Sequence, residues 1–148
     1  MHRILLAEDN RINQVVAAGV LKKLGYEVDI VDDGAAAVVA CAAEEYDAVL
    51  MDVMMPGVDG YQATGLIRDH ERAERLRPVP IIGLSARAMA GDRDIAFEAG
   101  MNDYLTKPVR TPELEAALER WIVPTLVPAS APAPVLAAVP LVEENVGR

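Results

Sequence analysis

Three acidic residues stand where a metal-dependent reaction could use them. Glu8 and Asp9 follow the apolar run 4–7, and Asp52 follows the apolar run 48–51 just before a Met-Pro-Gly turn. In an open parallel sheet, reactive groups collect just past the carboxyl ends of the strands. Neighbouring carboxylates raise each other's pKa unless a cation compensates, and Mg²⁺ prefers oxygen ligands while leaving positions for phosphate oxygens. The three acids therefore predict a site for Mg²⁺ and a phosphoryl group.

Lys107 and Ser85 could supply the other groups that such a reaction needs. Transfer of a phosphoryl group depends on positive charge and hydrogen-bond donors placed around its oxygens. Ser85 ends the fourth strand-like run and Lys107 follows the fifth, so both are expected at the same sheet edge as the acids. Each residue alone has an ordinary explanation, since acids and serines cap helices and lysines are commonly solvated. The joint placement of all five at four strand ends favours the chemical interpretation.

Short apolar runs alternate with longer helical patterns along the chain, and this alternation must position the five residues. Strands are expected at 4–7, 28–31, 48–51, 81–84 and 104–106. Helices are expected at about 11–24, 35–45, 60–72, 88–99 and 112–122, with breaks at Gly25, Gly34, Gly60, Gly100 and Pro112. The β-α alternation predicts an α/β fold, a doubly wound parallel sheet with helices on both faces.

Composition narrows the class of protein. A chain of 148 residues predicts one domain, and 52% apolar with 4% aromatic residues predicts a core of Ala, Val, Leu and Ile. The net charge of −9 disfavours nucleic acid as a partner, because a phosphate backbone requires clustered Lys and Arg. Cys41 lies in an apolar run, which favours a buried small residue over a reactive thiol.

Neither end of the given sequence has the pattern of a targeting or membrane-spanning segment. The run 4–7 is too short for the apolar core of a signal peptide, and the uncharged run 121–142 contains five prolines that a membrane-spanning helix would not tolerate. We therefore expect a cytoplasmic protein without direct membrane insertion. Its folded domain is predicted over 1–122, and 123–148 is interpreted as a Pro/Ala-rich tail or linker with no effector domain.

Residues 3–122 resemble the response-regulator receiver domain of two-component signalling, especially the receiver modules of hybrid histidine kinases. The resemblance is carried by 4–10 (ILLAEDN) with Asn13 and Gln14, by 51–60 (MDVMMPGVDG), by 84–86 (LSA) and by 103–108 (DYLTKP). It implies a flavodoxin-like sheet of five parallel strands in the order 2-1-3-4-5, flanked by five helices.

The resemblance also implies a role for each matching acid. Asp52 is then the phosphoacceptor and one of the ligands of Mg²⁺. Asp9 binds the metal directly, Glu8 acts mainly through metal-bound water, and the backbone carbonyl of Met54 supplies a further ligand.

Further roles implied by the resemblance concern the response to phosphorylation. Ser85 moves towards the phosphoryl group, Lys107 pairs with it, and Tyr104 changes rotamer as the following surface rearranges. The Lys107–Pro108 bond resembles the family's cis peptide. Met54 and Arg87 occupy positions that tune the lifetime of the phosphoryl group, with ordinary surface variation as the alternative.

The first predicted helix carries more apolar surface than one buried face requires. At about 100° per residue, its core side is expected to contain Asn13, Val16, Ala17, Val20 and Leu24. A second strip of Ile12, Val15 and Gly19 lies beside Lys22 and Lys23. Exposed strips often mark partner sites, although scattered surface apolar residues are common. We interpret this strip as the contact for a histidine kinase or a histidine phosphotransfer domain.

The favoured function is a phosphorelay switch that accepts a phosphoryl group on Asp52, uses Mg²⁺ and changes its protein contacts, including a phosphorylation-dependent homodimer. It would catalyse only its own phosphorylation and dephosphorylation. One alternative is a haloacid-dehalogenase-like phosphatase or phosphotransferase, which needs a second acid where Met54 stands. Another is a phosphorylation-independent interaction module, which the five site residues disfavour. The sequence leaves open whether this is a stand-alone receiver or a piece of a hybrid kinase.

Overall fold

The computed structural model describes residues 2–86 and 91–122 of the 148-residue chain. Its strands are β1 (Arg3–Ala7), β2 (Glu27–Val31), β3 (Ala48–Asp52), β4 (Ile81–Ser85) and β5 (Asp103–Thr106). Its helices are α1 (Arg11–Lys23), α2 (Gly34–Ala43), α3 (Gly60–Glu74), α4 (Asp92–Ala99) and α5 (Thr111–Trp121). Each predicted strand is present and is one residue longer than predicted.

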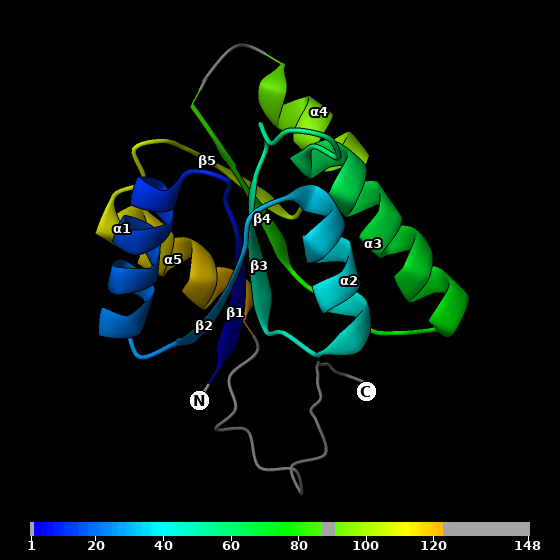
Figure 1. The fold of residues 1–148 in the computed structure, drawn as a ribbon, viewed down its shortest axis with the longest axis horizontal. Helices are drawn as coiled ribbons and strands as arrows, with labels where there is room; N and C mark the ends of the chain where they lie inside the picture. The colour runs from blue at the N-terminus through cyan, green and yellow to red at the C-terminus, as the bar shows by residue number, and fades with distance from the viewer. Residues whose placement is uncertain (1, 87–90, 123–148) are drawn as a thin grey trace, which may run out of the picture.

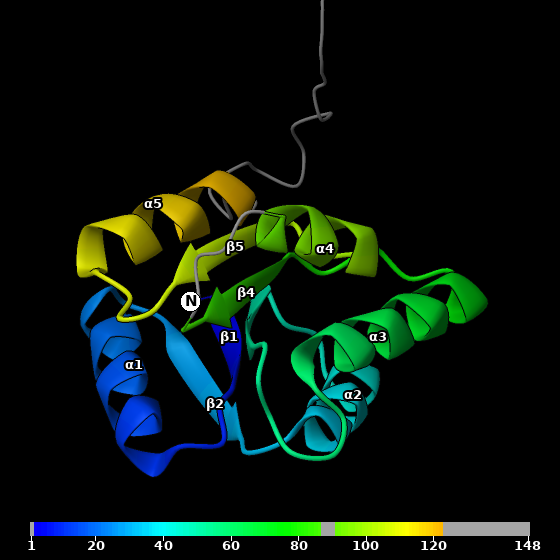
Figure 2. The same cartoon turned by 90° about the horizontal axis from the view of Figure 1, so that it is seen from above.

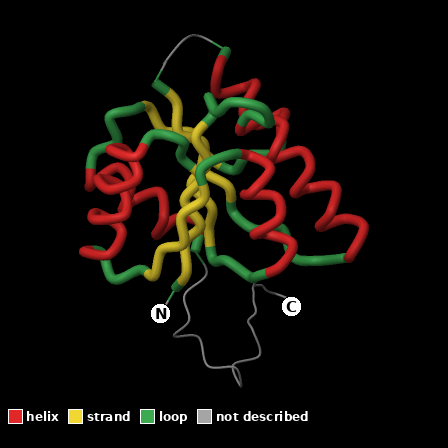
Figure 3. The backbone as a smooth tube through the Cα atoms, in the orientation of Figure 1, coloured by secondary structure: helices red, strands yellow, loops and turns green. Residues whose placement is uncertain are grey.

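The strands form one parallel sheet in the order β2-β1-β3-β4-β5, which confirms the predicted topology. Helices α1 and α5 cover one face of the sheet, and α2, α3 and α4 cover the other (Figures 1 and 2). The strands lie together between the two helical layers (Figure 3). All five strands therefore point their carboxyl ends towards the same edge.

The core divides into two layers because successive strand residues point to opposite faces of the sheet. Ile4, Leu6 and Leu50 pack towards α1 and α5. Leu5 and Met51, from the same strands, pack towards α2, α3 and α4. Strands covered on both faces need continuous apolar runs, which is why β1 and β3 read as unbroken hydrophobic segments.

Two helices near the acidic edge begin at side-chain caps. The Asn10 side chain accepts a hydrogen bond from the Asn13 backbone N–H (3.0 Å) and starts α1. Asp59 and Gln62 form a reciprocal capping box at the start of α3. These caps satisfy backbone N–H groups that have no partner within the helix.

Helix α1 is rotated relative to the sequence prediction. Ala18 and Leu21 are its buried residues, whereas Asn13 is exposed and Val16 is 61% exposed, so their assignment to the core side was wrong. The Gln14 side chain donates a hydrogen bond to the backbone oxygen of Glu8 (2.6 Å), which turns this side of the helix towards β1.

Some predictions fall on parts of the chain that the structure does not describe. Arg87, the first residues of the predicted helix 88–99 and the whole of 123–148 lie outside the described residues. In the described part, no helix has both the length and the apolar character needed to cross a membrane.

Candidate functional site

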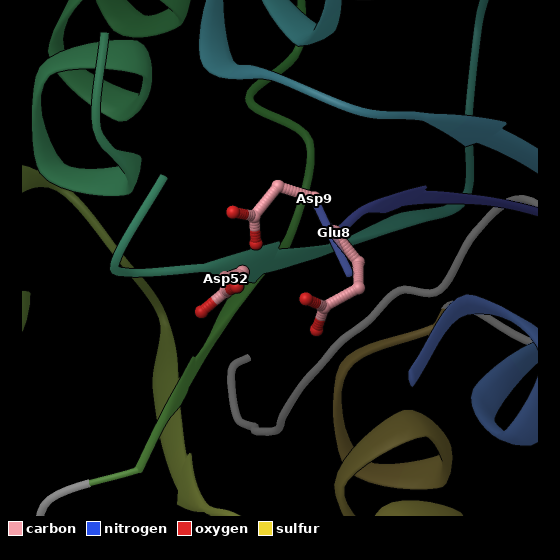
Figure 4. Close-up of side chains that lie close together, drawn as sticks. All are labelled: Glu8, Asp9 and Asp52. Carbon is pink, nitrogen blue, oxygen red and sulfur yellow. The ribbon is translucent and has the colours of Figure 1, made fainter. Parts of the chain in front are cut away.

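Glu8, Asp9 and Asp52 meet at the carboxyl edge of the sheet. Asp52 is the last residue of β3, and the two other acids directly follow β1, which pairs with β3. One carboxylate oxygen from each of the three residues lies within 4.8 Å of the others. Figure 4 shows the three side chains gathered beside the ends of these strands. Glu8 and Asp52 are buried, whereas Asp9 is exposed and leaves the group open to solvent.

Lys107, which directly follows β5, also contacts this acidic group. Its Nζ lies 2.8 Å from Glu8 Oε1 and 3.1 Å from Asp52 Oδ1. The Lys107 backbone N–H also donates to the backbone oxygen of Ser85 (2.6 Å), which ties the end of β5 to the end of β4. The Lys107–Pro108 peptide is cis, as expected.

Ser85 is the last residue of β4 and is buried. Its neighbour Leu84 is the register partner of Asp52, so the serine lies one residue beyond the acceptor candidate on the adjacent strand. The structure thus brings Glu8, Asp9, Asp52, Ser85 and Lys107 to one edge of the sheet.

Asp52 is held by its local backbone. The backbone N–H of Met54 approaches Asp52 Oδ1 at 3.3 Å, while the Met54 side chain is 69% exposed beside the acidic group. Helix α3 begins close against the end of β3, because a Cβ on Gly60 would lie only 2.3 Å from the backbone oxygen of Asp52. The Asp-Gly step at 59–60 is therefore a requirement for this approach and not only a helix break.

Burial raises the pKa of Asp52 to about 6; Lys107 opposes this rise, and the neighbouring Glu8 adds to it. Burial also raises the pKa of Glu8, but hydrogen bonds from Lys107 and from the Asn10 N–H outweigh it and leave that pKa below its usual range. Lys107 shows the reverse balance: burial lowers its pKa, and contacts with Glu8 and Asp52 raise it to a net value above normal. Glu8 and Lys107 thus form an ion pair in which both charges are stabilised, whereas the ionised form of Asp52 is disfavoured.

The donor set fits a hard divalent cation. Glu8, Asp9 and Asp52 offer carboxylate oxygens at close range, and Lys107 contacts two of them, Glu8 and Asp52. One lysine compensates three carboxylates incompletely, so a small oxygen-seeking ion such as Mg²⁺ would lower the repulsion around Asp52.

Tyr104 connects the site to the α4 side of the sheet. It is buried on β5, and it hydrogen-bonds Tyr61 at the start of α3. Burial raises the pKa of Tyr61 to about 12, and the interaction with Tyr104 contributes. The sequence prediction missed Tyr61. Its position directly after the Asp-Gly step was the available signal, since that step brings the start of α3 beside the strand ends.

The strip on α1 borders the acidic edge. Ile12 is 73% exposed and Val15 is 61% exposed, as predicted for this strip, and the misassigned Val16 extends it. Val15 and Val16 line a shallow groove that reaches Thr111 at the start of α5, with Lys23 at its rim. The strip is therefore an apolar surface beside the carboxylates.

The chain matches a known protein family. The family model of the response regulator receiver domain matches residues 4–119. The sensor histidine kinase GacS of Pseudomonas protegens is 40% identical over 119 residues, which cover 80% of this chain and 13% of that protein. Histidine kinase 5 of Arabidopsis thaliana is 34% identical over 143 residues and is matched over 16% of its length. The chain thus spans a small fraction of these relatives.

Solved structures similar to this chain are also receiver domains. The receiver domain of the sensor histidine kinase PA1611 from Pseudomonas aeruginosa, with a magnesium ion coordinated in its active site cleft, is 49% identical with a TM-score of 0.73, and the match covers 81% of this chain and 96% of that one. A chain in the co-crystal structure of the Saccharomyces cerevisiae phosphotransfer protein Ypd1 and the receiver domain of Ssk1 is 31% identical with a TM-score of 0.77, over 81% and 88% of the two chains.

Proposed function

Since the chain belongs to the response regulator receiver domain family, we propose that Asp52 is the residue that accepts the phosphoryl group. The chain is a receiver domain of the kind found in hybrid histidine kinases, a phosphoacceptor module of two-component phosphorelays. One observation carries the choice of Asp52: it is a buried carboxylate at a strand end that contacts Lys107, yet its pKa is raised, because burial disfavours its charge more than Lys107 favours it.

The proposed reaction is a phosphoryl transfer from a phosphohistidine. A carboxylate oxygen of ionised Asp52 forms a bond to phosphorus, the P–N bond to the imidazole breaks, and the departing nitrogen keeps the electron pair and takes up a proton. Lys107, 3.1 Å from Asp52, favours the ionised carboxylate and offers positive charge to the arriving oxygens. The domain performs no other reaction in this proposal, and water returns it to the free carboxylate.

Mg²⁺ is the proposed cofactor. Asp9 and Asp52 would hold it directly, Glu8 through water, and the backbone carbonyl of Met54 would complete the protein's share of the ligands. When bound, the ion supplies charge neutralisation for the phosphoryl oxygens. The acidic group of this chain supports the proposal, as does the magnesium ion in the similar PA1611 receiver.

The proposed switch runs through Ser85, Lys107 and Tyr104. A phosphoryl group on Asp52 offers new oxygens to the Ser85 hydroxyl and to Lys107, and it competes with Glu8 for the lysine. Tyr104 then adopts another rotamer, which takes it out of its buried position and breaks its hydrogen bond with Tyr61. Such a shift requires contacts that differ between the two states, and Lys107 provides one of them.

The proposed donor is a histidine kinase or a histidine phosphotransfer domain that docks on the α1 strip. Ile12, Val15 and Val16 are exposed apolar residues beside the acidic edge, and such residues suit the apolar face of a partner helix. The Ypd1–Ssk1 complex shows that a receiver domain pairs with a phosphotransfer protein. We further propose that the domain works in the cytoplasm, where ATP charges such donors, and that phosphorylation promotes a homodimer.

Intact-mass measurement with acetyl phosphate and Mg²⁺ tests the acceptor. The unmodified protein should gain one phosphoryl group and Asp52→Asn should gain none. Asp103→Asn is the matched control, because Asp103 is equally buried but lies at the other edge of the sheet; it should be phosphorylated normally. Undiminished incorporation in Asp52→Asn would show that another residue is the acceptor.

A further inference from the structure

Asp9 is held differently from the other two acids of the site. Glu8 and Asp52 are buried and contact Lys107, whereas Asp9 is exposed. The Asp9 carboxylate nevertheless offers an oxygen within 4.8 Å of the other two, and Figure 4 shows it over the end of β3 beside Asp52. An exposed side chain has little packing to fix it, so its direction depends on the backbone that carries it.

The peptide group that precedes Asp9 is held by Gln14. The side-chain amide of Gln14 donates a hydrogen bond to the backbone oxygen of Glu8 at 2.6 Å. Gln14 is itself fixed in the first turn of α1, where its backbone N–H donates to the Asn10 oxygen (2.9 Å). Because a peptide group is planar, holding the Glu8 oxygen also sets the direction of the Asp9 N–H.

The peptide group that follows Asp9 is held from a second direction. The Asn10 backbone N–H donates to Glu8 Oε2 at 3.1 Å. The other oxygen of that carboxylate binds Lys107 at 2.8 Å, and the Glu8 backbone N–H donates to the Val31 oxygen on β2 (3.0 Å). Both peptide groups around Asp9 are therefore fixed, which restricts its two backbone dihedral angles and the direction of its side chain.

We propose that Gln14 is a positioning residue for Mg²⁺, which acts by holding the Glu8–Asp9 peptide group so that the Asp9 carboxylate points towards Asp52. This role rests on the proposed use of Asp9 as a direct ligand. Mg²⁺ demands near-ideal octahedral geometry, so a ligand that is already aligned binds it better than one that must first be ordered. Water can replace the Gln14 donor at the Glu8 oxygen, but it cannot hold the peptide group in one direction.

The test is a titration of the full chain with Mg²⁺, followed by amide chemical shifts of Asp9 and Asp52. Gln14→Met keeps the length of the side chain and removes its donor. Its Mg²⁺ dissociation constant should rise about tenfold, the lower end of the effect of residues that orient metal ligands. Gln14→Ala, which also lacks the donor and adds no apolar side chain, should show the same loss.

Asn13→Leu is the matched control. Asn13 is the adjacent amide residue on α1 and is exposed, and its contact with Asn10 uses its backbone N–H, which the substitution retains. This variant should bind Mg²⁺ like the unmodified protein. Unchanged amide signals from the five strands verify the fold of each variant.

Two further measurements separate positioning from simple anchoring of α1 to β1. In Mg²⁺-free buffer, the amide order parameter of Asp9 should fall in Gln14→Met from the value of rigid backbone, about 0.85, towards that of flexible chain, about 0.6. With acetyl phosphate, the Mg²⁺ concentration for half-maximal phosphorylation should rise by the same factor as the dissociation constant, while the rate at saturating Mg²⁺ is retained. A residue that only anchors α1 would change the free energy of unfolding and neither of these quantities.

An unchanged Mg²⁺ dissociation constant in either Gln14 variant would overturn the proposal, as would an equal loss of affinity in Asn13→Leu. A loss of affinity without a change in the Asp9 order parameter would also count against it, because the effect would then not pass through this peptide group. Failure of the unmodified protein to bind Mg²⁺ would instead refute the proposed cofactor, and the role of Gln14 with it.

Discussion

Two buried aspartates lie at opposite edges of the sheet, and their pKa values are shifted in opposite directions. Asp52 ends β3 at the carboxyl edge, and Asp103 begins β5 at the amino edge; both are 3% exposed. Burial raises the pKa of each. At Asp52 the effect of burial dominates, and the pKa is about 6. At Asp103, hydrogen bonds from Trp121 and the Tyr104 N–H outweigh burial. The charges of Arg120 and Arg93 add to them, so the pKa of Asp103 lies below its usual range.

The difference lies in the partners. Asp103 accepts hydrogen bonds from Arg120 (2.6 Å), Trp121 Nε1 (2.9 Å) and the Tyr104 N–H (2.9 Å), so both of its oxygens are satisfied. Asp52 shares one lysine with Glu8 and faces two other carboxylates. A satisfied carboxylate anchors α5 to the sheet, while an incompletely compensated one is available to a cation and a phosphoryl group. Burial alone therefore does not identify a reactive aspartate.

The largest expected effect comes from removing the positive charge of Lys107 at the carboxyl edge. Lys107→Ala should still fold and accept a phosphoryl group on Asp52, but it should lose nearly all of the structural response, because the new phosphate has lost its cationic partner. Amide chemical shifts of Ser85 and Tyr104, recorded before and after phosphorylation, measure this response. Lys23→Ala is the control, since that lysine is exposed on α1; a normal response in Lys107→Ala would contradict the switch.

At the amino edge the expected effect is on stability. Asp103→Asn should lower the free energy of unfolding by about 2 kcal/mol at pH 7, because it replaces charge-assisted hydrogen bonds with weaker ones at a buried site. The folded-state pKa of Asp103 is depressed, so its contribution is present above the unfolded pKa near 4 and is lost as pH falls further. Urea titrations at pH 7 and pH 3 should show the variant's deficit shrinking at acid pH; an equal deficit at both would rule out the ionised form as its source.

A third prediction separates docking from chemistry at the carboxyl edge. Val15→Asp should slow phosphotransfer from the cognate phosphohistidine protein about tenfold, since an unpaired charge at an apolar contact costs on the order of 1–3 kcal/mol. Acetyl phosphate should be unaffected, because a small donor does not need the α1 strip.

The control for this docking variant is Val39→Asp on α2. Val39 is 67% exposed and Val15 is 61% exposed, so the two variants add the same charge at similar exposure on opposite faces of the sheet. Val39→Asp should leave both rates unchanged. Equal slowing of Val15→Asp with both donors would indicate a damaged site, and no slowing with either would remove α1 from the docking surface.

The smallest expected effect has the opposite sign to that of Asp103→Asn. In Mg²⁺-free buffer at pH 7, Asp52→Asn should raise the free energy of unfolding by about 1 kcal/mol. The substitution removes a buried carboxylate whose ionised form destabilises the folded state. The folded-state pKa of Asp52 lies above its unfolded value, so the folded protein binds more protons between about pH 4 and pH 6 and loses stability as pH rises through that window.

Thermal or urea unfolding at pH 4 and pH 7 checks this sign. The advantage of Asp52→Asn should be present at pH 7 and nearly absent at pH 4, and Mg²⁺ should reduce it by stabilising the unmodified protein. A variant less stable than the unmodified protein at pH 7 without metal would mean that Asp52 is as well satisfied as Asp103, and the contrast between the two edges would fail.

The fold and the acidic group were largely predictable because their signals are local. Strands β1, β3 and β4 consist mainly of apolar residues, and the order β2-β1-β3-β4-β5 follows the pattern of the family that the sequence resembles. Glu8, Asp9, Asp52, Ser85 and Lys107 could be assigned to one edge because parallel strands with helical crossovers all point the same way. The rotation of α1 was not predictable from periodicity, because its many small and apolar residues permit more than one buried side, and the contact from Gln14 to Glu8 selects one.

The sequence by itself determined which residues end the strands, because that depends on hydrophobic runs and turn residues close together in the chain. Only the tertiary structure decided what each buried carboxylate meets. Lys107 reaches Glu8 across 99 positions of sequence, and Asp103 meets Arg120 and Trp121 only because α5 folds back along the sheet. Side chains so distant in sequence become partners through packing of the whole domain, and those partners separate the reactive Asp52 from the structural Asp103.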